Sequence, residues 1–225
     1  MMSLLIAVKS CEADLRRGYH QVIRDTWGQN VVLPEADLLF FTGDFFPAAE
    51  LRSDEVSLPC KDDYDNLPLK TREICRYAVA RGYDYVLLCD TDTYIIPRLL
   101  LQVGFEKYDY YGLIQRPLGQ AFSYDAIDRH GAHHPGTYYP WASGGFGYFL
   151  SKRAANIIAH VEPDSWAEDL WVGQVMNEQY NHGRLTIGDA KNMVGQCTWH
   201  FPQVEYKSGY DLKFGWMEKM YREHR

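Results

Sequence analysis

The stretch Val86-Leu87-Leu88-Cys89-Asp90-Thr91-Asp92-Thr93-Tyr94 decides how this chain is organised. Its apolar first half is typical of a strand that is buried on both faces at the centre of a sheet. The strand delivers Asp90 and Asp92 to its carboxyl end, where open α/β sheets bind ligands. Two carboxylates this close repel each other, so they indicate a divalent metal that carries a diphosphate. A plain strand-end turn is the alternative, because Asp and Thr both suit turns and helix caps.

Strands and helices alternate on both sides of this stretch. Apolar runs predict strands at residues 4–8, 36–42, 54–60, 85–89 and 108–114, and apolar residues at helical spacing predict helices at 15–27, 67–81, 97–103, 152–160 and 168–180. Residues 116–137 are predicted to be a long polar loop, and the tail from Asn181 is less regular. The alternation predicts an α/β fold, a single domain over residues 1–225 with a mostly parallel central sheet flanked by helices.

The composition excludes some partners. The 225 residues carry a net charge of -7 and offer no basic stripe, which argues against nucleic acid. The apolar start of the chain is too short to span a bilayer, so we expect a soluble protein, cytoplasmic by default. The five cysteines form an odd set without close spacing, and reduced thiols are expected. Cys60 is the first candidate for a disulfide if the protein meets an oxidising compartment.

Five motifs in order resemble a known family. They are Arg24-Asp25-Thr26-Trp27, Asn66-Leu67-Pro68-Leu69-Lys70-Thr71, Asp90-Thr91-Asp92, the segment from Tyr139-Pro140 to Gly145-Phe146-Gly147-Tyr148, and Glu168-Asp169. This set resembles the fringe-like and β-1,3-galactosyltransferase-type enzymes of glycosyltransferase family 31. The chain departs from the family where Thr91 replaces the middle carboxylate of the acidic triplet and Leu170 replaces the valine after Glu168-Asp169. The membrane anchor and stem of eukaryotic members are not seen, so their Golgi location is not carried over.

The resemblance implies an activity and a fold. The family transfers a sugar with inversion from a UDP donor to an acceptor hydroxyl, with Mn²⁺, on a Rossmann-like GT-A fold. We therefore expect a metal-dependent transferase that moves a hexose or N-acetylhexosamine from a UDP-sugar to a glycan or glycoconjugate. Residues 1–115 would bind the nucleotide, and residues 116–225 would carry the acceptor and catalytic part. A retaining GT-A transferase and a non-catalytic carbohydrate-binding protein with a decayed site are the alternatives.

Metal ligands are expected at the acidic strand end. Asp92 is the first candidate, and Asp90 is the second, either for the metal or for the ribose. The resemblance implies that His200 supplies a third ligand, although a histidine packed among aromatic residues is the alternative. His133 and His134 could also bind a metal, but acceptor contact or solvation fits a flexible loop better.

The resemblance implies a catalytic base at Asp169. An acceptor hydroxyl must lose its proton as it attacks the anomeric carbon, and a carboxylate within hydrogen-bond reach can accept that proton. Glu168 is the alternative base. Both acids could instead only favour the start of a helix through its dipole.

Five further residues are expected to contact the donor. Gly144 and Gly145 would let the backbone approach the sugar closely, because they carry no side chain. Trp141 would offer a face for stacking, although a core aromatic residue is as good an interpretation. Arg24 and Lys70 would serve the diphosphate or nucleotide. A structural ion pair is the alternative for Arg24, whereas Lys70 lies near a helix start, where basic charge is unfavourable without a ligand.

Overall fold

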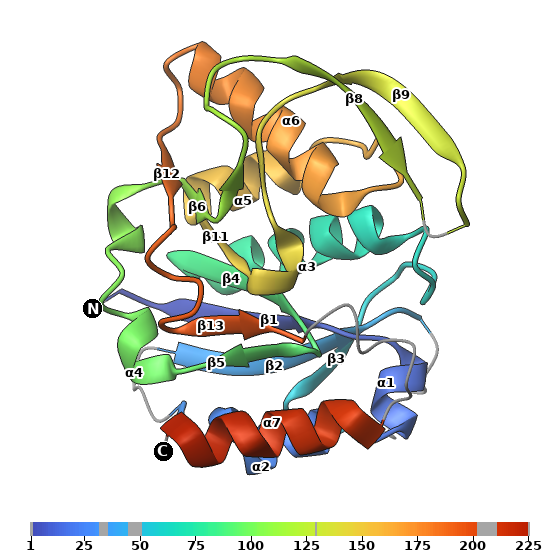
Figure 1. Cartoon of the computed structure of the whole chain (residues 1–225), viewed down its shortest axis with the longest axis vertical. Coiled ribbons are helices and arrows are strands. Elements are labelled where there is room, and N and C mark those ends of the chain that lie inside the picture. Colours follow the sequence, from blue (N-terminus) through green and yellow to red (C-terminus); the bar gives the residue numbers. More distant parts are fainter. Residues whose placement is uncertain (1, 32–35, 45–50, 129, 202–210, 225) are drawn as a thin grey trace.

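A seven-stranded sheet forms the centre of the computed structural model, which describes residues 2–31, 36–44, 51–128, 130–201 and 211–224 (Figure 1). Its strand order is β12-β6-β11-β4-β1-β2-β3. These strands are β1 (Leu4–Lys9), β2 (Ala36–Thr42), β3 (Glu55–Ser57), β4 (Tyr85–Asp90), β6 (Tyr110–Gly112), β11 (Tyr148–Ser151) and β12 (Ile187–Asp189). Only β11 runs antiparallel to its neighbours β4 and β6. The predicted mostly parallel α/β sheet is confirmed.

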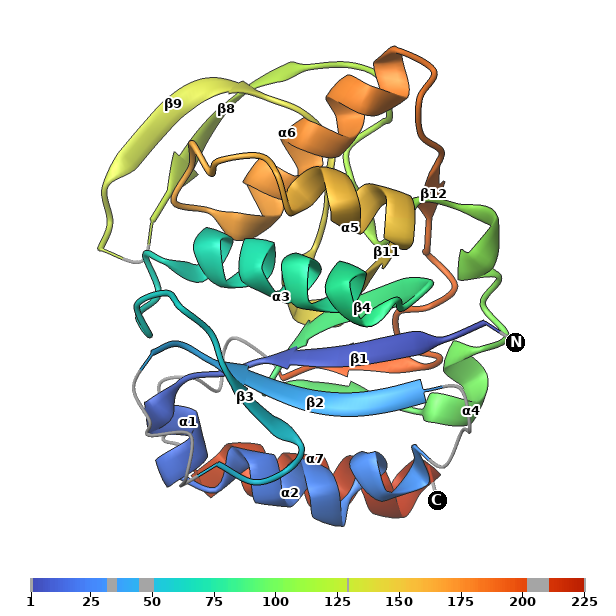
Figure 2. The ribbon, with the colours of Figure 1, turned by 180° about the vertical axis from the view of Figure 1, so that it is seen from behind.

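Helices cover both faces of the sheet (Figures 1 and 2). One face carries α3 (Leu67–Arg81), α5 (Lys152–Ile158) and α6 (Glu168–Asn181), and the other carries α2 (Tyr19–Asp25) and α7 (Asp211–His224). The shorter α1 (Glu12–Arg16) precedes α2, and α4 (Pro97–Leu100) follows β5 (Thr93–Ile95). None of the described helices is long and apolar enough to cross a membrane.

Two small strand pairs and several 3-10 turns complete the frame. β5 pairs with β13 (Thr198–His200), and β7 (Ile114–Gln115) pairs with β10 (Trp141–Ala142). The 3-10 turns are η1 (Trp27–Asn30), η3 (Phe105–Lys107) and η4 (Gly144–Phe146). The turn η4 lies between β10 and β11, and it contacts both β4 and β13. It therefore lies beside the end of the central strand.

The alternation of side chains along β1 sets up the site. Leu5 and Ala7 belong to the core under α3, α5 and α6, whereas Ile6 and Val8 belong to the core on the side of α2 and α7. Lys9 continues the first series, and its parallel partner on β4 is Asp90. The register therefore places a lysine beside a carboxylate at the carboxyl edge of the sheet, on the side of α6.

Four predicted elements differ from the structure in the first half of the chain. The helix predicted at 15–27 is split, because Gly18 takes a φ of 85° between α1 and α2. The predicted strand at 54–60 contracts to β3, and the predicted helix at 97–103 contracts to α4. The predicted strand at 108–114 becomes β6 and the start of β7. All five cysteines are described, and they form no disulfide among the described residues.

The prediction of a long loop at 116–137 is wrong. These residues contain an antiparallel hairpin of β8 (Phe122–Ile127) and β9 (His133–Tyr138). Pro135 and Gly136 suggest a loop in the sequence, but both lie within the ladder of β9. The hairpin forms a sheet of its own, where a proline at the edge is tolerated.

Gly173 provides a test of the packing between α6 and β10. A Cβ atom at residue 173 would come within 2.5 Å of the Trp141 Cβ atom. We expect Gly173→Ala to lower the free energy of unfolding by about 1–3 kcal/mol, because the helix must move away from β10. The matched control is Gly215→Ala in α7, where a Cβ atom would meet nothing within 4 Å. It should raise the free energy of unfolding by about 0.5–1 kcal/mol in the same urea titration. Shifts of equal sign would contradict this packing.

Candidate active site

A buried ammonium group lies at the centre of the candidate site. The Lys9 Nζ atom is 3.3 Å from Asp90 Oδ1 and 3.2 Å from Glu168 Oε2. The side chains of Lys9 and Glu168 are only 2% and 3% exposed, whereas that of Asp90 is 33% exposed. A buried charge is tolerated when it is paired, and here one cation serves carboxylates from β4 and α6. We call Lys9, Asp90 and Glu168 the charged triad.

Glu168 is held by further donors. Its Oε1 atom accepts hydrogen bonds from Thr71 Oγ1, at 2.7 Å, and from the Tyr148 hydroxyl. With Lys9 on Oε2, the carboxylate has partners from α3, β11 and β1. Glu168 is therefore built into the structure, which leaves Asp169 as the more available acid of the two.

Asp169 is partly exposed at the start of α6. Burial and the neighbouring charge of Glu168 raise the pKa of Asp169 to about 6, although Lys9 and the backbone amides of Leu170 and Gly144 oppose the shift. The Leu170 amide donates to Asp169 Oδ1 at 2.9 Å. A carboxylate that titrates near neutral pH can accept a proton and release it again, as a general base must.

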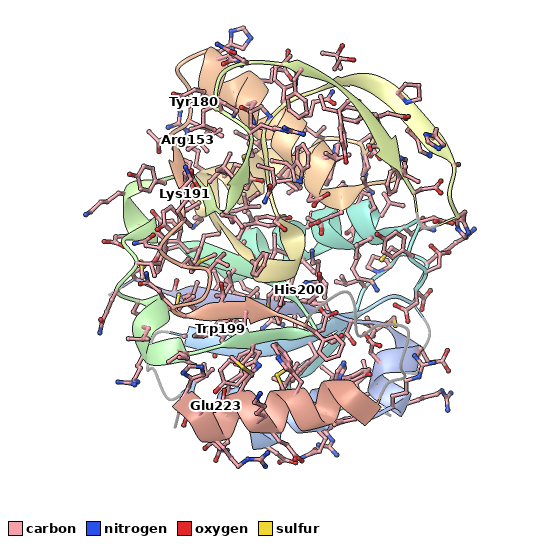
Figure 3. All side chains as sticks on the ribbon, viewed as in Figure 1. Arg153, Tyr180, Lys191, Trp199, His200 and Glu223 are labelled. Atoms are coloured by element: carbon pink, nitrogen blue, oxygen red, sulfur yellow. The ribbon has the colours of Figure 1, made fainter. Side chains whose placement is uncertain are left out.

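Asp92 and His200 meet beside the triad. Asp92 is buried, and its Oδ1 atom is 3.4 Å from His200 Nε2. The antiparallel pairing of β13 with β5 places His200 opposite Thr93, and the Asp92 carbonyl accepts from the Phe201 amide at 3.0 Å. Figure 3 shows His200 near the centre of the molecule at the end of β13. The structure therefore brings Asp92 and the distant His200 together, and their role as metal ligands stays a prediction.

The same two atoms could hold a metal ion. A carboxylate oxygen and an imidazole nitrogen 3.4 Å apart can both reach one divalent cation, so the pair fits such an ion. Within the described part of the chain, no three His, Cys, Asp or Glu side chains form a ready cluster for a metal. Further ligands would therefore come from Asp90, from water or from the phosphates of a donor.

The glycines of η4 fit around these side chains. A Cβ atom at Gly145 would come within 2.7 Å of the His200 ring, and one at Gly144 would lie 3.6 Å from Lys9 Nζ. The Gly145 carbonyl accepts from Thr93 Oγ1 at 2.9 Å, which fixes the turn against β5. At Gly145 the structure thus gives a reason for glycine within the protein, namely room for His200. Approach to a donor sugar stays a prediction.

Arg24 and Lys70 are engaged by the protein itself. Arg24 donates to both carboxylate oxygens of Asp54, at 2.7 and 2.8 Å, and to Glu55 at 2.7 Å. Lys70 is buried, and its Nζ atom is 2.7 Å from Asp62 Oδ1. These are the structural ion pairs that were the alternative for Arg24. A contact of either residue with a diphosphate stays a prediction.

Trp141 lies on the other side of the site, on β10. Its ring is 5.9 Å from Phe122, near parallel, and 5.9 Å from Tyr124. It also packs on a small apolar cluster that includes Ala167 and Leu170, the residues that flank Glu168 and Asp169. Trp141 is therefore grouped with the hairpin and the start of α6, rather than with Asp92 and His200.

Sequence reasoning missed Lys9, Thr71 and Tyr148 as parts of the site. A lysine at the carboxyl end of one buried strand, with an acid at the end of another, is a usable signal once the two strands are known to be neighbours. Thr71 and Tyr148 end two of the family-like motifs, but their approach to Glu168 depends on how α3 and β11 pack.

A family model described as Galactosyltransferase matches residues 19–182, most of the chain. No curated protein sequence matches the chain. A solved glycosyltransferase involved in the glycosylation of the major capsid of PBCV-1 superposes with a TM-score of 0.52 at 13% identity, covering 96% of this chain and 99% of that chain. This likeness shows the fold, which is the expected GT-A fold.

Two further solved structures are more distant. HddC from Yersinia pseudotuberculosis has a TM-score of 0.47 at 12% identity and covers 98% of this chain and 100% of its own. The 4-diphosphocytidyl-2C-methyl-D-erythritolsynthase from Anaerococcus prevotii has a TM-score of 0.47 at 10% identity and covers 98% and 99%.

Removal of the Lys9 charge tests the charged triad. Lys9→Met keeps the apolar stem but leaves Glu168 buried without its cation. We expect the free energy of unfolding to fall by about 3–5 kcal/mol at pH 7, measured by urea denaturation, because a buried charge loses its partner. The double variant Lys9→Met/Glu168→Gln should recover part of that loss, since no unpaired carboxylate remains. A single variant as stable as the wild type would show that the triad does not hold the fold together.

Proposed function

Because this chain belongs to the galactosyltransferase family and is a glycosyltransferase, we propose that it is an inverting, metal-dependent enzyme with a UDP-sugar donor. It would move a hexose or N-acetylhexosamine to a hydroxyl group of an acceptor glycan. Asp169 would be the general base, and Asp92 with His200 would hold the divalent cation. The observation that carries the proposal is the position and pKa of Asp169.

Asp169 has the properties that a base for this reaction needs. It is partly exposed, so an acceptor can reach it, and its pKa of about 6 leaves it ionised yet basic at neutral pH. Its neighbour Glu168 is 3% exposed and occupied by Lys9, Thr71 and Tyr148. The geometry therefore supports Asp169 over Glu168 as the base.

The chemical step balances with these residues. Asp169 accepts the proton of the acceptor hydroxyl while the oxygen of that hydroxyl forms a bond to the anomeric carbon. The bond from that carbon to the diphosphate oxygen breaks on the opposite face, and its electron pair leaves with UDP. Attack and departure on opposite faces invert the anomeric configuration. A positioned base of this kind typically contributes a factor of about 10²–10⁴ in rate.

The leaving group is the reason for a cation. A bound divalent ion would neutralise charge that develops on the diphosphate. Asp92 and His200 offer one oxygen and one nitrogen 3.4 Å apart, and Asp90, whose side chain is 33% exposed, lies at the same strand end. Asp90 is also bound by Lys9, so we assign it a supporting role, to the metal or to the ribose.

The pH dependence of transfer tests the base. Below about pH 6 Asp169 takes up a proton, so kcat/KM should fall about tenfold for each further pH unit. Asp169→Asn should lower kcat at least about 100-fold while UDP affinity changes less than about twofold, because the amide cannot accept the proton. Transfer rates with a panel of UDP-sugars measure kcat and kcat/KM, and calorimetric titration with UDP measures the affinity.

The same experiment identifies the stereochemistry. NMR of the product should show an inverted anomeric centre. Retention of configuration, or an Asp169→Asn variant with wild-type kcat, would contradict the role of Asp169.

Metal removal tests the donor site. In the wild type, Mn²⁺ should tighten UDP binding about 10–100-fold, and EDTA should reverse this, because a cation held by Asp92 and His200 would neutralise charge on the phosphates. Asp92→Ala should lose the effect of Mn²⁺. Asp25→Ala, an exposed aspartate of α2, is the control and should keep it. UDP affinity that does not respond to EDTA in the wild type would count against the metal.

A further inference from the structure

The hairpin of β8 and β9 presents one aromatic face. Its register pairs Phe122 with Tyr138, Tyr124 with Gly136 and Ala126 with His134. Because neighbouring residues of a strand point to opposite sides, Phe122, Tyr124 and Tyr138 share a face. The opposite face carries residues such as Ser123 and Thr137, which are both exposed. The hairpin is therefore amphipathic, with its aromatic side turned toward β10 and α6.

Four rings form a continuous group, which we call the aromatic strip: Phe122, Tyr124, Tyr138 and Trp141. The ring of Tyr124 lies 5.9 Å from Tyr138, edge to face, and 5.9 Å from Trp141, tilted by 35°. Tyr124 stays 36% exposed and Trp141 is partly exposed, so the strip is not closed off as a core. The contacts hold the rings in place and leave ring surface open to a ligand.

The strip adjoins the catalytic acid. Trp141 and Tyr138 pack against Ala167 and Leu170, which flank Glu168 and Asp169 in the chain. Figures 1 and 2 show the hairpin arching over α6, with its tip on the side where α3 begins. At that tip His130 Nε2 lies 3.9 Å from Asp65 Oδ1. The hairpin thus spans from β10, across the start of α6, to the segment before α3.

Two carboxylates of the hairpin each contact a histidine. His133 Nδ1 lies 2.7 Å from Asp125 Oδ2, and His134 Nε2 lies 2.9 Å from Asp128 Oδ2. On the aromatic face the two strands carry Phe122, Tyr124, Ala126, His134, Gly136 and Tyr138, with no carboxylate, lysine or arginine among them, which favours an uncharged polar ligand. Aromatic rings with polar groups at their border suit a ligand with an apolar face and hydroxyl groups at its edge. A pyranose ring has this chemistry.

We propose that the aromatic strip is the acceptor subsite, and that it holds a neutral pyranose ring of the acceptor glycan against Tyr124 and Trp141. This inference rests on the proposed function, since the ring must present a hydroxyl to Asp169. It moves Trp141 from the donor, where the sequence prediction placed it, to the acceptor. Tyr124, which sequence reasoning did not single out, becomes a residue that sets acceptor affinity.

Saturation-transfer NMR tests this subsite directly. The probes are the methyl β-pyranosides of galactose, glucose, N-acetylglucosamine and xylose, each with the full chain, UDP and Mg²⁺. We expect saturation transfer to the C–H face of at least one probe. The saturation-transfer signal should fall at least threefold in Tyr124→Ala. Tyr124→Phe should keep the signal, because the ring remains. Tyr180→Ala is the matched control, since Tyr180 is also 36% exposed but lies at the far end of α6 (Figure 3).

The outcomes separate the two proposals. Equal signals in the wild type and Tyr124→Ala, or no transfer to any of the four probes, would overturn the acceptor subsite. A UDP titration of the same samples measures binding at the donor site independently of the strip. Failure of UDP to bind the wild type would count against the proposed function, whereas normal UDP binding with no effect of Tyr124→Ala would overturn only the inference about the strip.

Discussion

The ion pairs of Lys9 are the interaction on which the rest of the site depends. A lysine side chain that is 2% exposed must have partners, and it finds them on β4 and α6. The pairing joins three segments that are far apart in the sequence. It also fixes the start of α6 against the end of β1, and Asp169 is the next residue along that helix. The position of the proposed base thus follows from the burial of one ammonium group.

This arrangement gives two adjacent acids different properties. Glu168 has a cation and two hydroxyl donors, whereas Asp169 has backbone amides and the repulsion of Glu168. Environments that differ in this way separate the roles of neighbouring carboxylates. The ionisation of Asp169 above its raised pKa also opposes folding, because the unfolded chain ionises at lower pH. The ionised Asp169 therefore lowers the free energy of unfolding.

The sequence was enough for most of the central sheet and for the acidic strand end, but not for the edge strand β12 in the tail. Strand β2 and helix α3 have the predicted bounds, since an uninterrupted apolar run and a helix between Asn66 and Gly82 depend on local residues. The position of His200 beside Asp92 came from the resemblance and not from any local pattern. The split at Gly18 and the hairpin were missed, because one depends on a single φ angle and the other alternates around Pro135 and Gly136. Helix α7 could have been found from the spacing of Phe214, Met217 and Tyr221.

The candidate site was harder to predict than the fold, because its partners come together only in three dimensions. The acids were visible, but Lys9 looked like the end of a strand, and Trp141 was assigned to the donor sugar, whereas we propose that it contacts the acceptor. The central claim is that burial and Glu168 tune Asp169 to act as a base. The most direct measurement is a ¹³C NMR titration of the Asp169 carboxyl group in the ligand-free protein. A midpoint near pH 6 is predicted, and a midpoint near pH 4 would contradict the account.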